Sequence, residues 1–253
     1  MMKGIPGDIT PDGKYVEKQV IPCYMTDGSK QLKPAGFMDI AQEMGFRAAT
    51  AMHFGYDDLI AEGKAWVLSR LYFRYVDMIY WRDEVTVSTW NRGPIGPFFY
   101  RDFRVQGEHG LLLATSAWLV LDLYERTIAR HAACLENIPP QYQCDEAVLD
   151  VPAAKIVIPK SLECSFVRDH VVDYADVDML GHTNNARYMV WAMDCIGYEQ
   201  AEQGSPAEVW INFNHEARPG DVVSLYRAQD GNTYYVEGKV GDSTAFLVKI
   251  AYQ

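Results

Sequence analysis

The chain has 253 residues, of which 49% are hydrophobic and 13% aromatic. It can therefore bury one large core or two smaller ones, and this excludes disordered and fibrous classes. Its formal charge is −11, from 23 basic and 34 acidic side chains, which makes nucleic acid and anionic membrane surfaces unexpected partners.

The first half of the sequence predicts one buried helix followed by long strands. Apolar side chains surround much of a helical stretch over Gly36–Met52, and such a helix is usually enclosed by its surroundings. Period-two alternation and runs of β-branched and aromatic residues then predict strands near 66–75, 84–90, 98–105 and 111–121. This order indicates an α+β fold in which an antiparallel sheet wraps around a helix.

Residues 138–160 form a polar segment interrupted by prolines, which predicts a linker. After it the same plan recurs, with a strand over 164–174, a helix over about 184–200, and strands over 208–215, 222–229, 234–240 and 245–252. We therefore expect a first domain over 1–137, a linker over 138–160 and a second domain over 161–253.

The two halves can be aligned with each other. Residues of matching type then fall opposite one another: Phe37 and Tyr188, Asp27 and Asp178 at an offset of 151, and Asp83 and Asp221 at an offset of 138. Such matches through both helix and strand indicate an internal duplication. The first half has Gln31 where the second has His182, so we expect any chemistry in the second half.

The sequence does not call for a metal or a cofactor. Its five cysteines form no CxxC pair, and its six histidines lack HExxH spacing. Residues 1–7 hold no apolar signal segment, and the longest apolar run, over 111–123, is too short to cross a bilayer. We expect a cytoplasmic protein without disulfides, metal or cofactor.

One dense polar cluster, Asp176–Tyr188, lies between a predicted strand and the second predicted helix. An Asn or Thr here can cap that helix. The helix N-terminus also offers unpaired N–H groups and the positive end of a dipole, which suit a carbonyl oxygen that gains negative charge. With Asp178 and His182 beside it, the loop holds a base, a proton handler and an oxyanion site.

The pattern D-x-D-x-x-x-H-x-N-N-x-x-Y in this cluster resembles the catalytic loop of hotdog-fold thioesterases. Together with Trp81–Val85 and Ala114–Asp122, the whole chain resembles acyl-ACP thioesterases with two fused hotdog domains. The resemblance implies two tandem hotdog domains, each a long helix wrapped by an antiparallel sheet. It also implies hydrolysis of fatty acyl-ACP in fatty acid biosynthesis, with the acyl chain held by the first domain and catalysis in the second.

By position, the family's catalytic residues fall on Asp178, His182 and Glu216. A thiol with a pKa of ~8.5 leaves readily, so the reaction mainly needs an activated water and a stabilised oxyanion. Asp178 and Glu216 would share the base and water-orienting roles in either order. His182 would position the water or protonate the sulfur, and amides near 183–185 would hold the oxyanion.

Two positions depart from the plant members of that family. They have an Asn two residues after the catalytic Asp, where this chain has Leu180, and Asn184 or Asn185 is left to orient the water. They also have a Cys after the Glu, where this chain has Ala217, so a cysteine nucleophile is excluded at that position.

The partner implied by the resemblance is acyl carrier protein bearing acyl-phosphopantetheine, and a homodimer is left open. Acyl carrier protein is strongly acidic, so a chain with a charge of −11 would repel it unless basic residues gather locally. The candidates for such a patch are Lys30, Lys33, Arg70, Arg74, Arg187 and Arg218. Three alternatives therefore stay open: an acyl-CoA thioesterase, a hotdog dehydratase or hydratase, and a non-catalytic acyl-binding module in which Leu180 marks lost chemistry.

Overall fold

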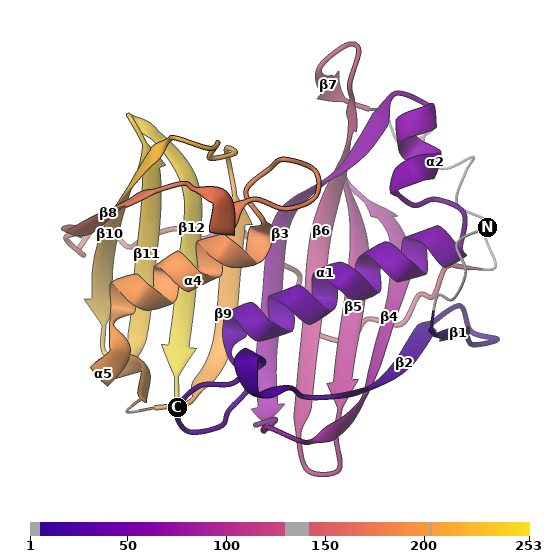
Figure 1. Ribbon diagram of the computed structural model, residues 1–253, viewed down its shortest axis with the longest axis horizontal. Helices are drawn as coiled ribbons and strands as arrows, with labels where there is room; N and C mark the ends of the chain where they lie inside the picture. Colours follow the sequence, from indigo (N-terminus) through magenta and orange to yellow (C-terminus); the bar gives the residue numbers. More distant parts are fainter. Residues whose placement is uncertain (1–5, 130–141, 203) are drawn as a thin grey trace.

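The computed structural model describes residues 6–129, 142–202 and 204–253 and has an α+β architecture (Figure 1). Two long helices, α1 (Pro34–Ala51) and α4 (Asn185–Ile196), cover one face of an antiparallel sheet; their first turns are neighbours, and from there they run in opposite directions. The strands are β1 (Asp8–Ile9), β2 (Tyr15–Val20), β3 (Lys64–Asp77), β4 (Glu84–Ile95), β5 (Phe98–Gln106), β6 (Leu111–Asp122), β7 (Thr127–Ile128), β8 (Ser165–Val171), β9 (Pro206–Phe213), β10 (Val222–Asp230), β11 (Thr233–Val240) and β12 (Ser243–Tyr252).

The sheet is continuous through both halves of the chain. Its order is β1-β2-β4-β5-β6-β3-β9-β12-β11-β10-β8, with β7 paired to β6. The order β2-β4-β5-β6-β3 in the first half is therefore repeated in the second as β8-β10-β11-β12-β9. The halves meet where β3 and β9 pair from Arg70 opposite Asn212 to Arg74 opposite Glu208. At the centre of this junction the rings of Tyr72 and Trp210 stack, with centroids 4.7 Å apart.

The internal duplication is visible in the backbone. The short helices η1 (Cys23–Met25) and η3 (Tyr174–Asp176) occupy positions 151 apart, and α1 and α4 begin 151 residues apart. The Ile21 amide donates to the Asp83 carbonyl at 3.0 Å, and its counterpart, the Val172 amide, donates to the Asp221 carbonyl at 2.9 Å. Both offsets predicted from the sequence thus hold at the level of single hydrogen bonds.

The two long helices form where the apolar pattern predicts them. In α1 the Phe37 ring lies 4.8 Å from the ring of Phe73 and 6.4 Å from that of Phe103, so the helix is anchored on the strands beneath it. The second predicted helix is divided: Gly197, with φ of +98°, ends α4, and α5 (Tyr198–Glu202) follows. A further short helix, α2 (Tyr56–Ala61), follows α1. Among the described residues, no helix has the length and apolar character needed to cross a membrane.

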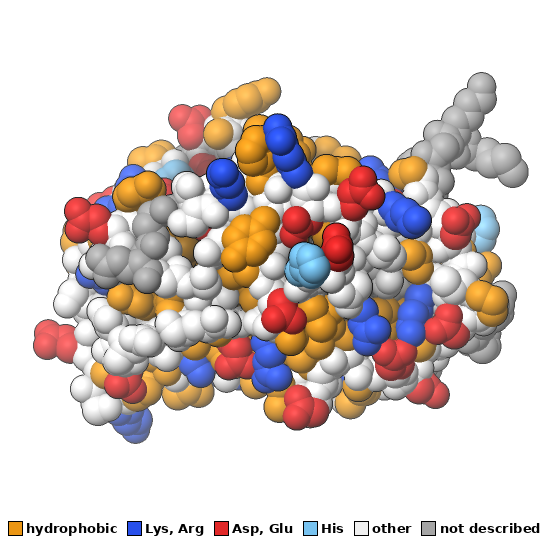
Figure 2. All heavy atoms as spheres, turned by 90° about the horizontal axis from the view of Figure 1, so that it is seen from below, with side chains coloured by type: hydrophobic (Ala, Val, Ile, Leu, Met, Phe, Trp, Pro, Cys, Tyr) orange, Lys and Arg blue, Asp and Glu red, His pale blue; other side chains and the backbone are white. Residues whose placement is uncertain are grey.

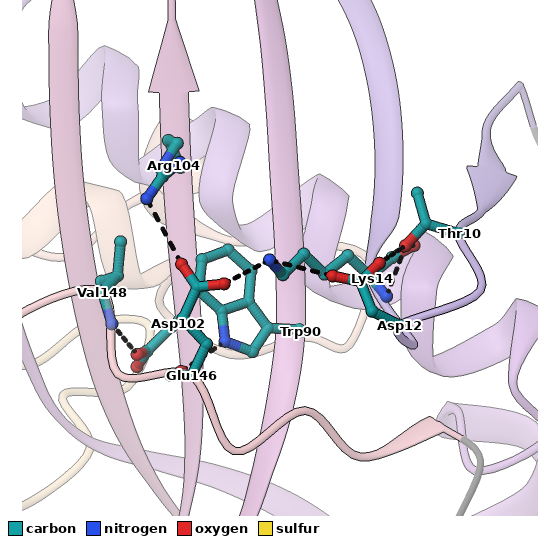
Figure 3. Close-up of polar contacts among 8 residues, drawn as sticks. All are labelled: Thr10, Asp12, Lys14, Trp90, Asp102, Arg104, Glu146 and Val148. Carbon is teal, nitrogen blue, oxygen red and sulfur yellow. Dashed lines mark hydrogen bonds and ion pairs between the residues drawn. The ribbon is translucent and has the colours of Figure 1, made fainter.

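The described part of the segment between the halves crosses the face of the sheet opposite the helices. The Trp90 Nε1 donates to the Glu146 carbonyl at 2.8 Å, and the Val148 amide donates to Asp102 Oδ2 at 2.9 Å (Figure 3). Further along, the Ile156 amide donates to Asn212 Oδ1 at 2.7 Å. The predicted linker is therefore a bound strap where the structure describes it, and the expected boundary between 137 and 138 lies outside the described residues.

Candidate active site

The turn between η3 and α4 carries Asp178 and His182 at its two ends. The Asp178 amide donates to the His182 carbonyl at 2.9 Å, and Asp178 Oδ1 accepts from the amides of Leu180 at 2.9 Å and of His182 at 3.4 Å. Gly181 lies inside the turn with φ of +76°, a conformation that glycine adopts without steric strain. The carboxylate of Asp178 therefore organises the turn that presents His182.

Glu216 reaches the same place from the loop after β9. Its Oε1 lies 3.7 Å from His182 Nε2, and its Oε2 lies 3.6 Å from Arg218 Nε. The His182 side chain is 62% exposed and that of Glu216 35% exposed, so a substrate arriving from solvent can reach both. The structure thus brings His182 and Glu216 together, with Asp178 at the base of the same turn.

Asn184 is the N-cap of α4. Its side-chain oxygen accepts the hydrogen bond of the Ala186 amide at 2.8 Å, so the capping role predicted for an Asn or Thr of this cluster is confirmed for Asn184. Because the cap occupies this oxygen, any contact between Asn184 and a water would fall to its side-chain NH₂ group. The positive end of the α4 dipole faces the loop that carries His182.

Two hydroxyl groups that sequence reasoning missed connect the site loop to α4. The Ala217 amide donates to the Tyr188 hydroxyl at 3.0 Å, and the Thr183 hydroxyl donates to the Ala217 carbonyl. Thr183, Tyr188 and Ala217 are all buried. The signal that could have found them is the alignment of the halves, where Tyr188 falls opposite Phe37.

Asp176 belongs to the structural frame of the loop. The residue is 6% exposed, and its carboxylate binds His170 Nε2 at 2.8 Å and Trp191 Nε1 at 3.2 Å. Burial opposes ionisation, but hydrogen bonds from the Asp173 amide and from His170 outweigh it and hold the pKa of Asp176 below its ordinary value. Asp176 therefore ties η3 to β8 and α4.

The first half contains the same turn without the same side chains. Asp27 donates its amide to the Gln31 carbonyl at 3.0 Å and accepts the Gln31 amide at its Oδ1 at 2.9 Å, as Asp178 does with His182. At the offset of 138, Met78 takes the place of Glu216. The repeat thus keeps the backbone of the turn in both halves, but the combination of carboxylates and imidazole is present in the second half alone.

Comparison with known proteins places both halves in one family. Residues 12–135 match the family model of the acyl-ACP thioesterase N-terminal domain, and residues 160–245 match that of the C-terminal domain. The chloroplastic oleoyl-acyl carrier protein thioesterase of Coriandrum sativum is 22% identical over 242 residues, and oleoyl-acyl carrier protein thioesterase 1 of Arabidopsis thaliana is 23% identical over 242 residues. Each alignment covers 86% of this chain but only 63% and 64%, respectively, of those relatives.

Solved structures with the same fold cover nearly the whole chain. An acyl-ACP thioesterase from Bacteroides thetaiotaomicron superposes with a TM-score of 0.80 at 22% identity and covers 96% of this chain and 98% of its own. The 12:0-ACP thioesterase from Umbellularia californica superposes with a TM-score of 0.82 at 16% identity and covers 95% of this chain and 97% of its own. At these identities the superpositions show a shared fold.

Proposed function

The chain belongs to the acyl-ACP thioesterase family, and from this premise we propose that it hydrolyses fatty acyl-ACP thioesters to free fatty acid and acyl carrier protein. The observation that carries the proposal is the combination of Asp178, His182 and Glu216 at the N-terminus of α4, with no equivalent set in the matching turn of the first half.

In the proposed mechanism these side chains act on one water molecule and on the carbonyl group of the thioester. Asp178 and Glu216 activate and orient the water, which attacks the thioester carbonyl carbon. The developing oxyanion is held by backbone amides near 183–185, where the N-terminal end of the α4 dipole favours negative charge. His182, 3.7 Å from Glu216, positions the water or gives a proton to the departing thiolate. The leaving group is the thiol of phosphopantetheine.

We propose that the two repeated halves are two hotdog domains, over 1–137 and 161–253, joined by the segment 138–160. In support, each half has one long helix over the same order of five strands, to which the first half adds the short strands β1 and β7. The first domain would hold the acyl chain, since α1 lies on an apolar layer that includes Phe37, Phe73 and Phe103. The described residues of the connecting segment would then brace the sheet on its outer face.

The carrier is proposed from the family and from local charge. On the face shown in Figure 2, Lys and Arg side chains are scattered among Asp and Glu and do not gather in one area. Near the site, Arg218 lies beside Glu216 with 77% of its side chain exposed, and Arg187 of α4 lies 3.8 Å from Asp39 of α1. These two arginines would meet the acidic carrier or the phosphate of phosphopantetheine at the entrance.

The test is release of free thiol from acyl-ACP and acyl-CoA substrates of medium and long chains, compared by kcat/KM. Asp178→Asn, His182→Ala and Glu216→Gln should each lower kcat by about 10²–10⁴, the usual contribution of a positioned acid or base. Asp27→Asn is the matched control, since it alters the equivalent turn of the first half, and it should keep kcat within about twofold of the unmodified chain.

Each outcome of this test selects one reaction or carrier. Preference for acyl-ACP, lost in Asp178→Asn, supports the proposal as stated. Preference for acyl-CoA keeps the chemistry and replaces the carrier. No thiol release from any substrate refutes the hydrolase and favours the dehydratase, hydratase or acyl-binding alternatives, which are separated by assaying addition or loss of water on acyl thioesters.

A further inference from the structure

The loop that carries Glu216 is fixed to α4 and the turn before it through both backbone polar groups of one residue, Ala217. Tyr188 of α4 accepts the amide hydrogen of Ala217 at 3.0 Å, and Thr183, just before the helix, donates its hydroxyl to the carbonyl of the same residue. Ala217 is fully buried, and Tyr188 and Thr183 are 3% and 5% exposed. Both polar backbone groups of the residue next to Glu216 are thus satisfied by side chains from the catalytic turn and its helix.

The carboxylate of Glu216 is held less directly. Its described partners, His182 and Arg218, lie 3.7 and 3.6 Å away, longer than hydrogen-bond distance. Both partners are themselves exposed, so neither fixes the carboxylate firmly. The place of Glu216 beside His182 is therefore set mainly by its backbone, and that backbone is fixed at Ala217.

The first half shows that the fold does not need the two hydroxyls. Tyr188 and Thr183 correspond to Phe37 and Leu32 at the offset of 151. In place of the side-chain bond, the Leu32 amide donates to the carbonyl of Ile79, the counterpart of Ala217, at 2.8 Å. The repeat therefore closes the same loop with a backbone bond where it has no carboxylate to place.

We propose that Tyr188 and Thr183 are positioning residues, which clamp Ala217 so that the carboxylate of Glu216 faces His182. This inference rests on the proposed function. Hydroxyls occur at these two positions in the half that has Glu216 and are replaced by apolar side chains in the half that has Met78. These two differences between the halves indicate that the hydroxyls serve the site, since the fold forms without them in the first half.

The first experiment separates positioning from substrate binding. Tyr188→Phe leaves the ring in place but removes the acceptor of the buried Ala217 amide. We expect kcat to fall by about 10–100-fold, since a displacement of about 1 Å at a catalytic group has a cost of this order, while KM changes by no more than about twofold. Thr183→Val should act in the same direction, and Thr183→Ser, which restores the donor, should recover most of kcat.

The second experiment asks whether Tyr188 acts through Glu216. In a Glu216→Gln background, Tyr188→Phe should lower kcat no further, because the group that it positions is already lost. Tyr72→Phe is the matched control: it removes another buried tyrosine hydroxyl, the donor to Glu208 on the opposite face of the sheet, and should leave kcat unchanged.

The outcomes distinguish this inference from the function on which it rests. A wild-type chain that releases no thiol from any acyl-ACP or acyl-CoA overturns the proposed function and the clamp with it. Wild-type turnover together with an unchanged kcat in Tyr188→Phe, or with losses that multiply in the double variant, overturns the clamp alone. A loss of kcat in Tyr72→Phe equal to that in Tyr188→Phe also overturns it, because general destabilisation would then explain both.

Discussion

Asn212 of β9 fastens the connecting segment to the sheet, and its replacement by leucine tests how much this contact contributes to stability. Its Oδ1 accepts the Ile156 amide at 2.7 Å, and its Nδ2 donates to the Ala154 carbonyl at 3.2 Å. Asn212 is 3% exposed and Ile156 is 6% exposed, so water cannot replace the first bond, whereas Ala154 is exposed and its carbonyl can be hydrated. Leucine keeps the branching and the number of heavy atoms of the side chain and removes both bonds.

The expected loss follows from these two bonds. An unsatisfied buried amide costs about 1–3 kcal/mol, and a bond whose partner can be hydrated contributes about 0.5 kcal/mol. We therefore expect Asn212→Leu to lower the free energy of unfolding by about 2 kcal/mol. For a chain of this size about 1 kcal/mol corresponds to about 2–4 °C, so Tm should fall by about 4–8 °C.

The assay is thermal and urea unfolding of the full chain, with hydrogen exchange at the Ile156 amide as a local measure. Exchange at that amide should become faster than in the unmodified chain, since its hydrogen bond is lost. Asn214→Leu is the control: Asn214 is two residues away and exposed, and its substitution should change stability by less than about 0.5 kcal/mol. A loss below about 0.5 kcal/mol in Asn212→Leu would refute the assignment of this contact as a stabilising clasp.

Three further substitutions have expected outcomes. Gly181→Ala places a side chain at φ of +76°, which should lower the free energy of unfolding by about 1 kcal/mol and also lower kcat. A thermal scan and a thiol-release assay test this, and a Tm and kcat equal to those of the unmodified chain would contradict it. Burial raises the pKa of Asp102, whose carboxylate accepts a hydrogen bond from the Val148 amide, so ionisation of this buried group lowers the stability of the fold as the pH rises through that pKa. The Tm of Asp102→Asn should therefore increase relative to that of the unmodified chain between pH 4 and pH 8, and a relative decrease over this range would count against the reasoning. Burial lowers the pKa of Arg101 to about 10, and its guanidinium donates to the Thr89 hydroxyl at 3.3 Å. Arg101→Met should raise the free energy of unfolding measured in urea by about 1 kcal/mol, and a loss of stability would show that the charge is better compensated than this contact indicates.

Most of the fold follows from the hydrophobic pattern. The strands predicted at 66–75, 84–90, 98–105 and 111–121 all lie within β3 to β6, because these segments carry either period-two alternation or runs of β-branched and aromatic residues. The strand β2 was missed, since Glu17 stands at a buried position of its alternation. That residue is 5% exposed and is satisfied by the Tyr15 hydroxyl at 2.6 Å and by Arg47 at 2.7 Å, partners that single-strand periodicity does not reveal.

The site could be predicted only in part, because local spacing identifies residues within one turn but not those that the fold brings to it. Asp178 and His182 share one turn and are recognisable from their spacing, whereas Glu216 was placed by family resemblance. Its approach to His182 depends on the loop after β9, which only the three-dimensional fold brings to α4. The hydroxyl of Tyr188 was missed because an aromatic residue in a helix is ordinarily a packing residue, and its hydrogen bond becomes apparent only when the loop is in place.

The junction of β3 and β9 has a consequence for which chains can pair with one another. Tyr72 and Trp210 correspond at the offset of 138, so a pseudo-twofold axis relating the two halves passes between them. Arg74 lies opposite Glu208, and Glu208 is the residue of the second half that corresponds to Arg70. Two copies of the first half joined about this axis would set Arg70 against Arg74 twice, whereas the fused chain forms an Arg74–Glu208 ion pair at 2.8 Å. The charges at this seam therefore favour pairing between unlike halves over pairing of two first halves.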